Sequence, residues 1–165
     1  MENIILIGMP SSGKTTMGKM LAEKLNRKFF DIDKLIEEEE GKTIPEIFEE
    51  KGEEYFRDLE SKVLEDISKE NGLVIASGGG TPLRAENRDY ISQNSLVIYL
   101  KRDLEKLETS GRPLSKNLED LKKLYNERKG IYEDLANIKI DVIEDKTDNL
   151  ELIIKKVENY EIISD

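Results

Sequence analysis

The chain is 165 residues long, carries 26 Lys and Arg against 36 Asp and Glu, and has a formal net charge of −10. That length is typical of one domain with its own hydrophobic core, and the charge argues against nucleic acid or an anionic membrane as a partner. The sequence contains no Cys and no His, which excludes disulfides, thiolate or imidazole catalysis, and metal sites built from those residues. Any chemistry must use carboxylates, Lys, Arg, hydroxyls, backbone N–H groups and an oxygen-binding cation such as Mg²⁺.

Nothing in the sequence has the pattern of a targeting or membrane segment. No basic region precedes the first apolar run, and no apolar stretch approaches the roughly 20 residues that a membrane span needs. We therefore expect a soluble, cytoplasmic protein with no membrane partner, and we expect it to be a monomer.

Short apolar blocks alternate with longer charged segments along the chain. Five blocks have the length and β-branched content of buried strands: 3–7, 28–31, 73–76, 96–100 and 138–143. Other segments have helical character over 15–25, 33–40, 44–51, 53–69, 84–92, 103–108, 117–129 and 149–160. This alternation predicts an α/β fold with a five-stranded parallel sheet and helices on both faces. Because there is no internal repeat or Pro-rich linker, we predict one domain over 1–165.

The first specific motif runs from Gly8 to Thr15 and matches G-x-x-x-x-G-K-[ST] at every fixed position. The glycines permit a backbone wrap whose N–H groups point toward an anion, Lys14 reaches the β- and γ-phosphates, and the Thr15 hydroxyl can ligate Mg²⁺. A buried-type strand precedes the motif and an amphipathic helix follows it, as a P-loop requires. We therefore predict a nucleoside triphosphate site with Mg²⁺. Its predicted residues in this loop are Ser11, Ser12, Gly13, Lys14, Thr15 and Thr16.

A P-loop serves kinases, switches and motors alike, so the reaction must be inferred from other residues. Asp31 and Asp33 end the second predicted strand, where ligands bind in an open parallel sheet, and in extended geometry both side chains leave the same face. One carboxylate can hold Mg²⁺ through its water shell while the other orients or deprotonates an acceptor hydroxyl. The third strand ends at Ser77 instead of an acid, which favours Asp31 on the metal side. The alternative for Asp33 is a helix N-cap.

Seven of the 26 basic residues are Arg. Guanidinium groups match carboxylates and phosphates, so an acidic protein that handles anions needs some of them in its site. Arg57 lies beside the apolar face of its predicted helix, Arg112 lies in a loop that could close over phosphates, and Arg128 lies near a helix end. For each of them the alternative is a surface ion pair. Three glycines at 78–80 would let backbone N–H groups approach an anion, and the alternative there is a flexible turn.

The residues after the second strand form a longer pattern that is more specific than the P-loop alone. It comprises Phe30-Asp31-Ile32-Asp33, Ile36-Glu37, Gly41, Ile44, Ile47-Phe48, Gly52-Glu53, Phe56-Arg57 and Glu60, then the glycine triplet and Arg112-Pro113-Leu114. In this pattern the chain resembles the shikimate kinase family, over about residues 3 to 140. The resemblance implies a P-loop NTPase fold of the nucleoside-monophosphate-kinase type, with an acceptor-binding segment at about 33–61 and a lid at about 109–117. It also implies transfer of the ATP γ-phosphoryl group to the 3-hydroxyl of shikimate, in aromatic amino-acid biosynthesis.

On the nucleotide side, the resemblance implies that Lys14 and the loop around it hold the phosphates. Thr15 is then a Mg²⁺ ligand, and Asp31 holds the water shell of the ion. Arg112 comes from the lid, binds ATP and stabilises the transferring phosphoryl group.

On the acceptor side, the resemblance implies that Asp33 binds the reacting hydroxyl and acts as the base. Arg57 and Arg128 clamp the carboxylate of shikimate, and Gly79 donates a backbone N–H nearby. Glu60 orients Arg57 or the ring hydroxyls.

Three segments differ from the family pattern. Lys106 or Leu107 stands where members often place an arginine on adenine, the lid continues with Ser115, and Lys-Gly-Ile-Tyr follows Arg128 in place of a pattern with Pro-Leu-Tyr. Two alternatives stay open at this point. One is a P-loop kinase that acts on a gluconate-like acid or a nucleoside monophosphate, and the other is a nucleotide-binding regulator without transfer activity. Arg57 suits a carboxylated acceptor better than a nucleotide base.

Overall fold

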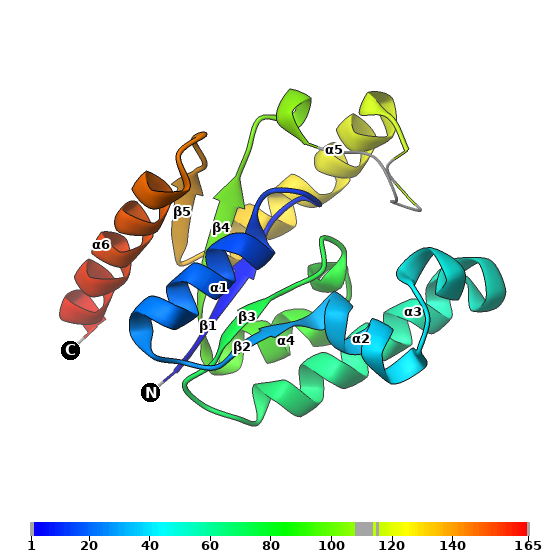
Figure 1. The fold of residues 1–165 in the computed structure, drawn as a ribbon, viewed down its shortest axis with the longest axis horizontal. Helices are drawn as coiled ribbons and strands as arrows, with labels where there is room; N and C mark the ends of the chain where they lie inside the picture. The colour runs from blue at the N-terminus through cyan, green and yellow to red at the C-terminus, as the bar shows by residue number, and fades with distance from the viewer. Residues whose placement is uncertain (1, 108–113, 115, 165) are drawn as a thin grey trace.

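The computed structural model describes residues 2–107, 114 and 116–164 of the chain. It contains one parallel sheet of five strands in the order β2-β3-β1-β4-β5, which confirms the predicted α/β architecture (Figure 1). The strands are β1 (Asn3–Ile7), β2 (Phe29–Asp31), β3 (Val74–Ala76), β4 (Ser95–Lys101) and β5 (Ile138–Asp141). Each lies within one to two residues of its predicted position at either end.

Helices cover both faces of the sheet (Figure 1). The α-helices are α1 (Lys14–Leu25), α2 (Ile32–Glu40), α3 (Ile44–Ser68), α4 (Ala85–Gln93), α5 (Leu118–Leu135) and α6 (Lys146–Ser164), and the 3₁₀ turns are η1 (Thr81–Leu83) and η2 (Leu104–Lys106). Successive residues of β1 divide between two cores: Ile4 and Leu6 pack with α1 and α6, whereas Ile5 and Ile7 pack with α2 to α5. This double burial explains why the strand reads as an uninterrupted apolar run.

Three helical predictions need correction. The two helices expected over 44–51 and 53–69 form one element, α3, which is interrupted by non-helical backbone at Gly52 (φ 83°). The helix expected over 103–108 is only the short turn η2 within the described residues. Helix α5 runs six residues past its predicted end at 129, because Tyr132 is buried in the core and tertiary packing outweighs the weak helix propensity of Gly130.

The strand order places the predicted site residues at one edge of the sheet. The P-loop follows β1, Asp31 ends β2, and the glycine triplet follows β3, while β1, β3 and β2 are neighbours. Because the strands are parallel, all three segments leave the sheet at its carboxyl edge, where open α/β sheets bind ligands.

Substitution of two glycines that lie in helices tests the packing of this fold. Gly18→Ala is expected to lower the free energy of unfolding by about 1–3 kcal/mol, because the added Cβ would lie 2.4 Å from Cε2 of Phe29. Gly130→Ala is the matched control: apart from the adjoining backbone of its own helix, no described heavy atom lies within 4 Å of its added Cβ, so the better helix propensity of Ala should raise stability by about 0.5–1 kcal/mol. Urea unfolding measures both, and shifts of the same sign would contradict the packing described.

Candidate active site

The P-loop has the backbone of an anion cradle. Gly8, Ser11 and Gly13 have positive φ angles of 146°, 60° and 97°, which turn the chain around a small space. Gly8 also has no room for a side chain, because a Cβ there would lie 2.6 Å from the carbonyl oxygen of Leu100. Lys14 folds back and donates from Nζ to the carbonyls of Gly8 (2.9 Å) and Met9 (2.8 Å).

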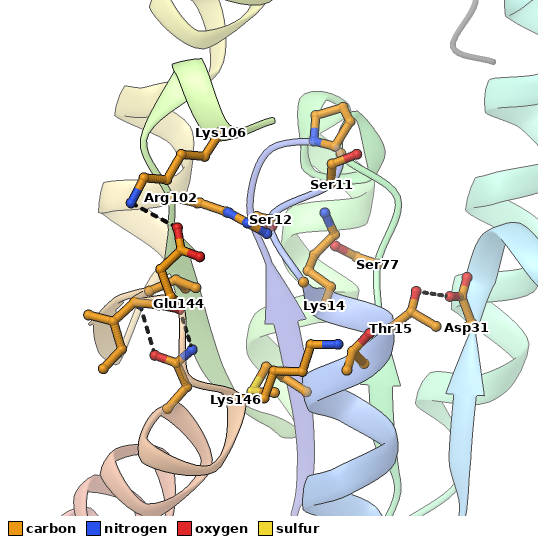
Figure 2. A pocket seen from close by; sticks show the side chains of 18 of the residues that line it. Ser11, Ser12, Lys14, Thr15, Asp31, Ser77, Arg102, Lys106, Glu144 and Lys146 are labelled. Atoms are coloured by element: carbon orange, nitrogen blue, oxygen red, sulfur yellow. Dashed lines mark hydrogen bonds and ion pairs between the residues drawn. The ribbon is translucent and has the colours of Figure 1, made fainter. Parts of the chain in front are cut away.

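Helix α1 begins at Lys14, directly after the loop, and no side chain caps its first turn. Backbone N–H groups at the start of a helix can donate to a phosphate, which the positive end of the helix also attracts. A cavity of about 380 Å³ opens in front of them (Figure 2). The predicted site residues that line it are Ser11, Ser12, Gly13, Lys14, Thr15, Thr16, Asp31, Asp33 and Gly79.

Thr15 and Asp31 meet at the edge of this cavity. The Thr15 hydroxyl donates to Oδ2 of Asp31 at 2.5 Å (Figure 2). A hydroxyl and a carboxylate side by side, next to a phosphate cradle, are the hard oxygen ligands that Mg²⁺ takes from a protein when nucleotide phosphates and water supply the others. The residues present therefore fit a Mg²⁺ ion.

Asp31, not Asp33, caps helix α2. Its side chain accepts from the backbone N–H of Lys34 at 3.3 Å, and the helix begins at Ile32. The capping alternative for Asp33 is therefore wrong. The expectation that the two aspartates share a face through extended geometry is also wrong, because Asp33 lies in the first turn of a helix. Both carboxylates still line one cavity, since the turn from β2 into α2 lies at its rim.

The carboxylate of Asp33 is buried, and one of its oxygens lacks a hydrogen-bond partner in the described part of the chain. Its Oδ1 atom is buried and has no hydrogen-bond partner among the described residues. Burial, reinforced by the negative charges of Glu60 and Asp31, raises the pKa of Asp33 to about 7, against the opposing effect of Lys14 and Arg57. A carboxyl with this pKa can change protonation state near neutral pH, which is the property of a general base.

Arg57 and Glu60 form a buried ion pair next to Asp33. The two residues are 8% and 0% exposed, so the surface ion pair considered as the alternative for Arg57 is wrong. Glu60 also accepts from the Thr81 hydroxyl at 2.8 Å, and Arg57 reaches Glu53 at 3.3 Å. These contacts hold the guanidinium in place, and a contact with Arg57 is one of the two roles that the family resemblance implied for Glu60.

The glycine triplet lies between the two predicted clamp arginines. A Cβ on Gly79 would lie 3.1 Å from Nη1 of Arg128, and a Cβ on Gly80 would lie 2.5 Å from the guanidinium nitrogens of Arg57. Arg128 is 3% exposed, and its Nε has no hydrogen-bond partner within the described part of the chain. The structure thus brings Asp33, Arg57 and Arg128 together around the triplet, and close approach of side chains to its backbone is why glycine is needed.

Two predictions concern residues that the structure does not describe. Arg112 lies outside the described residues, and so does most of the predicted lid at 109–117.

Sequence reasoning missed the far wall of the nucleotide cavity. Arg102 follows β4, and Glu144 and Lys146 follow β5, yet all three line the cavity together with the P-loop (Figure 2). Lys106, at the position where the family often has an arginine, also lines the cavity and forms an ion pair with Glu144 at 3.2 Å. The position of these residues just after parallel strands was a usable signal, because every such loop opens at the same edge.

A phosphate cradle, a Thr–Asp pair suited to Mg²⁺, and a buried carboxylate on the same cavity with two arginines close by define an ATP-dependent kinase that acts on a hydroxyl group. The family model described as shikimate kinase matches residues 10–158. The chain belongs to the shikimate kinase family, as the sequence pattern predicted.

Individual relatives agree with the family. The chain is 48% identical over 147 residues to a shikimate kinase of Sulfurihydrogenibium sp. (strain YO3AOP1), covering 86% of this chain and 88% of the relative. It is similar to the solved structure of the Acinetobacter baumannii shikimate kinase in complex with shikimate, with a TM-score of 0.89, 35% identity, and coverage of 99% and 94% of the two chains. A gluconokinase from Sinorhizobium meliloti 1021 has a TM-score of 0.56 at 16% identity, covering 99% of this chain and 98% of its own, which shows a shared fold alone. Within the described residues, no helix combines the length and apolarity needed to cross a membrane.

Asp33→Asn is expected to remove a pH dependence of stability. The folded state holds the Asp33 proton up to a pKa of about 7, whereas the unfolded chain releases it near 3.8, so wild-type stability falls as the pH rises through this window. The variant lacks this loss and should gain stability relative to wild type between pH 4 and pH 8. Urea unfolding across that range checks it, and a stability difference that does not change with pH would contradict the raised pKa.

Proposed function

We propose that the chain transfers the γ-phosphoryl group of ATP to the 3-hydroxyl of shikimate and releases shikimate 3-phosphate and ADP. Family membership supports this reaction, and one observation carries it. Asp33 Oδ1 and Arg128 Nε, both buried, have no partner among the described residues, and the two side chains lie close to Gly78 and Gly79 of the triplet. Buried polar atoms without partners are rare in folded proteins, so this arrangement suits a ligand with a hydroxyl at one end and an anion at the other.

The two arginines account for binding of the acceptor. Shikimate carries a carboxylate, and guanidinium groups bind carboxylates through paired, charge-assisted hydrogen bonds. In our proposal Arg57 and Arg128 hold this carboxylate, and the Gly79 N–H donates beside them. The ion pair with Glu60 already holds the Arg57 side chain in one conformation, so Arg57 loses little side-chain entropy when the acceptor binds.

Asp33 accounts for activation of the hydroxyl. As the oxygen of the 3-hydroxyl forms its bond to the γ-phosphorus, its proton passes to the Asp33 carboxylate, and the bond from the γ-phosphorus to the bridging oxygen of ADP breaks. A base with a pKa of about 7 is ionised often enough to accept this proton and basic enough to hold it.

In our proposal the phosphates of ATP bind at the P-loop. Lys14 and the N–H groups at the start of α1 bind the β- and γ-phosphates in our proposal, and Thr15 and Asp31 hold Mg²⁺, directly and through its water shell. Mg²⁺, when bound, neutralises charge on the transferring and leaving groups. Arg112 remains a predicted contributor of positive charge from the lid.

In our proposal the chain works as a monomer. The formal net charge of −10 supports a protein with no nucleic acid or membrane partner, and we place it in the cytoplasm.

An acceptor screen tests the reaction directly. ADP release should require both shikimate and Mg²⁺, with little turnover on gluconate or on nucleoside monophosphates. Coupled detection of ADP measures each rate, and phosphorus NMR of the product locates the phosphate. Turnover on gluconate or a nucleoside monophosphate without turnover on shikimate would contradict the proposal, and nucleotide binding without turnover on any acceptor would favour a regulator.

Arg57→Lys should raise the KM for shikimate at least tenfold and leave the KM for ATP unchanged. Lysine keeps a positive charge beside Glu60 but loses the planar fork that pairs with a carboxylate. Arg84→Ala is the control, because Arg84 forms ion pairs with the exposed residues Glu54 and Asp58 and not with the buried Glu60. Steady-state kinetics decide, and equal shikimate KM values for Arg57→Lys and wild type would remove Arg57 from the clamp.

A further inference from the structure

Tyr132 is a buried polar residue that the proposed mechanism does not use. It lies on α5, one helical turn after Arg128, and is 1% exposed. Its ring packs against Tyr99 with a centroid distance of 5.1 Å. Its hydroxyl donates to the carbonyl oxygen of Gly79 at 2.5 Å and lies 4.0 Å from the sulfur of Met9 in the P-loop.

The hydrogen bond from Tyr132 supports the glycine triplet at its middle residue. The carbonyl of Gly78 accepts from the backbone N–H of Thr81 at 3.2 Å, and that of Gly80 accepts from Leu83 at 3.0 Å, so both are held within the η1 turn itself. The carbonyl of Gly79 instead accepts from a helix 53 residues further along the chain. Because glycines have no side chains to anchor them, this bond fixes the triplet relative to α5.

The same triplet separates the two clamp arginines. Gly79 fits between Arg128 and Pro10, with only 3.1 Å and 2.9 Å available to an added Cβ, and Gly80 lies against the guanidinium of Arg57. Arg57 comes from α3 and Arg128 from α5, and both helices contact η1. A shift of the triplet relative to α5 would therefore change the separation of the two guanidinium groups.

Burial also keeps the tyrosine in its donating form. The pKa of Tyr132 is raised to about 12, chiefly because burial disfavours the phenolate, although Arg128 opposes this effect. The hydroxyl thus remains a donor throughout the range in which Asp33 changes its protonation state.

We propose that Tyr132 is a positioning residue, which uses its hydrogen bond to Gly79 to set the spacing of Arg57 and Arg128 and so determines affinity for the acceptor carboxylate. This inference rests on the proposed function, because it assigns the two arginines to one carboxylate. The Tyr132 hydroxyl reaches Gly79 and the side chain of Met9, whereas Lys14 binds the Met9 carbonyl, so we expect the larger effect on the acceptor and not on ATP.

The test compares two variants that each delete one hydroxyl from the same ring pair. Tyr132→Phe should raise the KM for shikimate about three- to tenfold, the effect of one net hydrogen bond, with the KM for ATP within twofold of wild type. Tyr99→Phe is the matched control, because no hydrogen bond involving its hydroxyl occurs in the described part of the structure, and both KM values should stay within twofold. Thermal unfolding of each variant accompanies the kinetics.

A double-mutant cycle separates positioning from a general effect on stability. If Tyr132 acts through the clamp, then adding Tyr132→Phe to Arg128→Lys should change the KM for shikimate by less than twofold, because the paired contact is already lost. Full additivity in the cycle would overturn the proposal. Equal kinetics for Tyr132→Phe and Tyr99→Phe would overturn it too, as would equal rises in both KM values.

The wild-type reaction separates this inference from the proposed function. If wild type fails to phosphorylate shikimate, the proposed function itself has failed. If wild type phosphorylates shikimate and Tyr132→Phe has no selective effect, only the positioning role has failed.

Discussion

The rest of the site depends on a cluster of buried charged side chains next to the glycine triplet. Asp33, Arg57 and Glu60 place two carboxylates and one guanidinium in a small volume, and Glu60 already has Arg57 and Thr81 as partners. Asp33 is left with a buried oxygen that nothing described satisfies. Such a group destabilises the folded chain and is retained where a ligand completes it. Here the natural complement is a hydroxyl that can give up its proton.

The fold brings the residues of the site together because three turns lie at the same edge of the sheet. The order β2-β3-β1 brings the end of β2, the glycine triplet after β3 and the P-loop after β1 to one edge of the sheet. The triplet can then approach both Asp33 and Arg128, since a Cβ on Gly78 would lie 2.8 Å from Oδ1 of Asp33 and one on Gly79 would lie 3.1 Å from Arg128. The proposed phosphate and acceptor sites thus share one edge of the sheet, which is the condition for in-line transfer between two bound molecules.

The sequence was sufficient for features that are local. A contiguous motif revealed the P-loop, and apolar runs revealed each strand, because both depend on neighbours in the chain. Roles that depend on tertiary structure were harder to predict. The choice of Arg57 and Arg128 among seven arginines came from a family resemblance, since spacing alone does not show which guanidinium points inward. The capping role of Asp31 was missed because the helix starts two residues earlier than expected for a cap at Asp33. Tyr132 and Arg102 were missed because their contacts come from distant segments.

The most direct measurement is a crystal structure of the chain with shikimate and ADP bound. The account predicts the 3-hydroxyl within hydrogen-bond distance of Asp33 Oδ1 and the carboxylate of shikimate between Arg57 and Arg128. Shikimate bound in the opposite orientation, with its carboxylate away from both arginines, or bound elsewhere on the molecule, would contradict it.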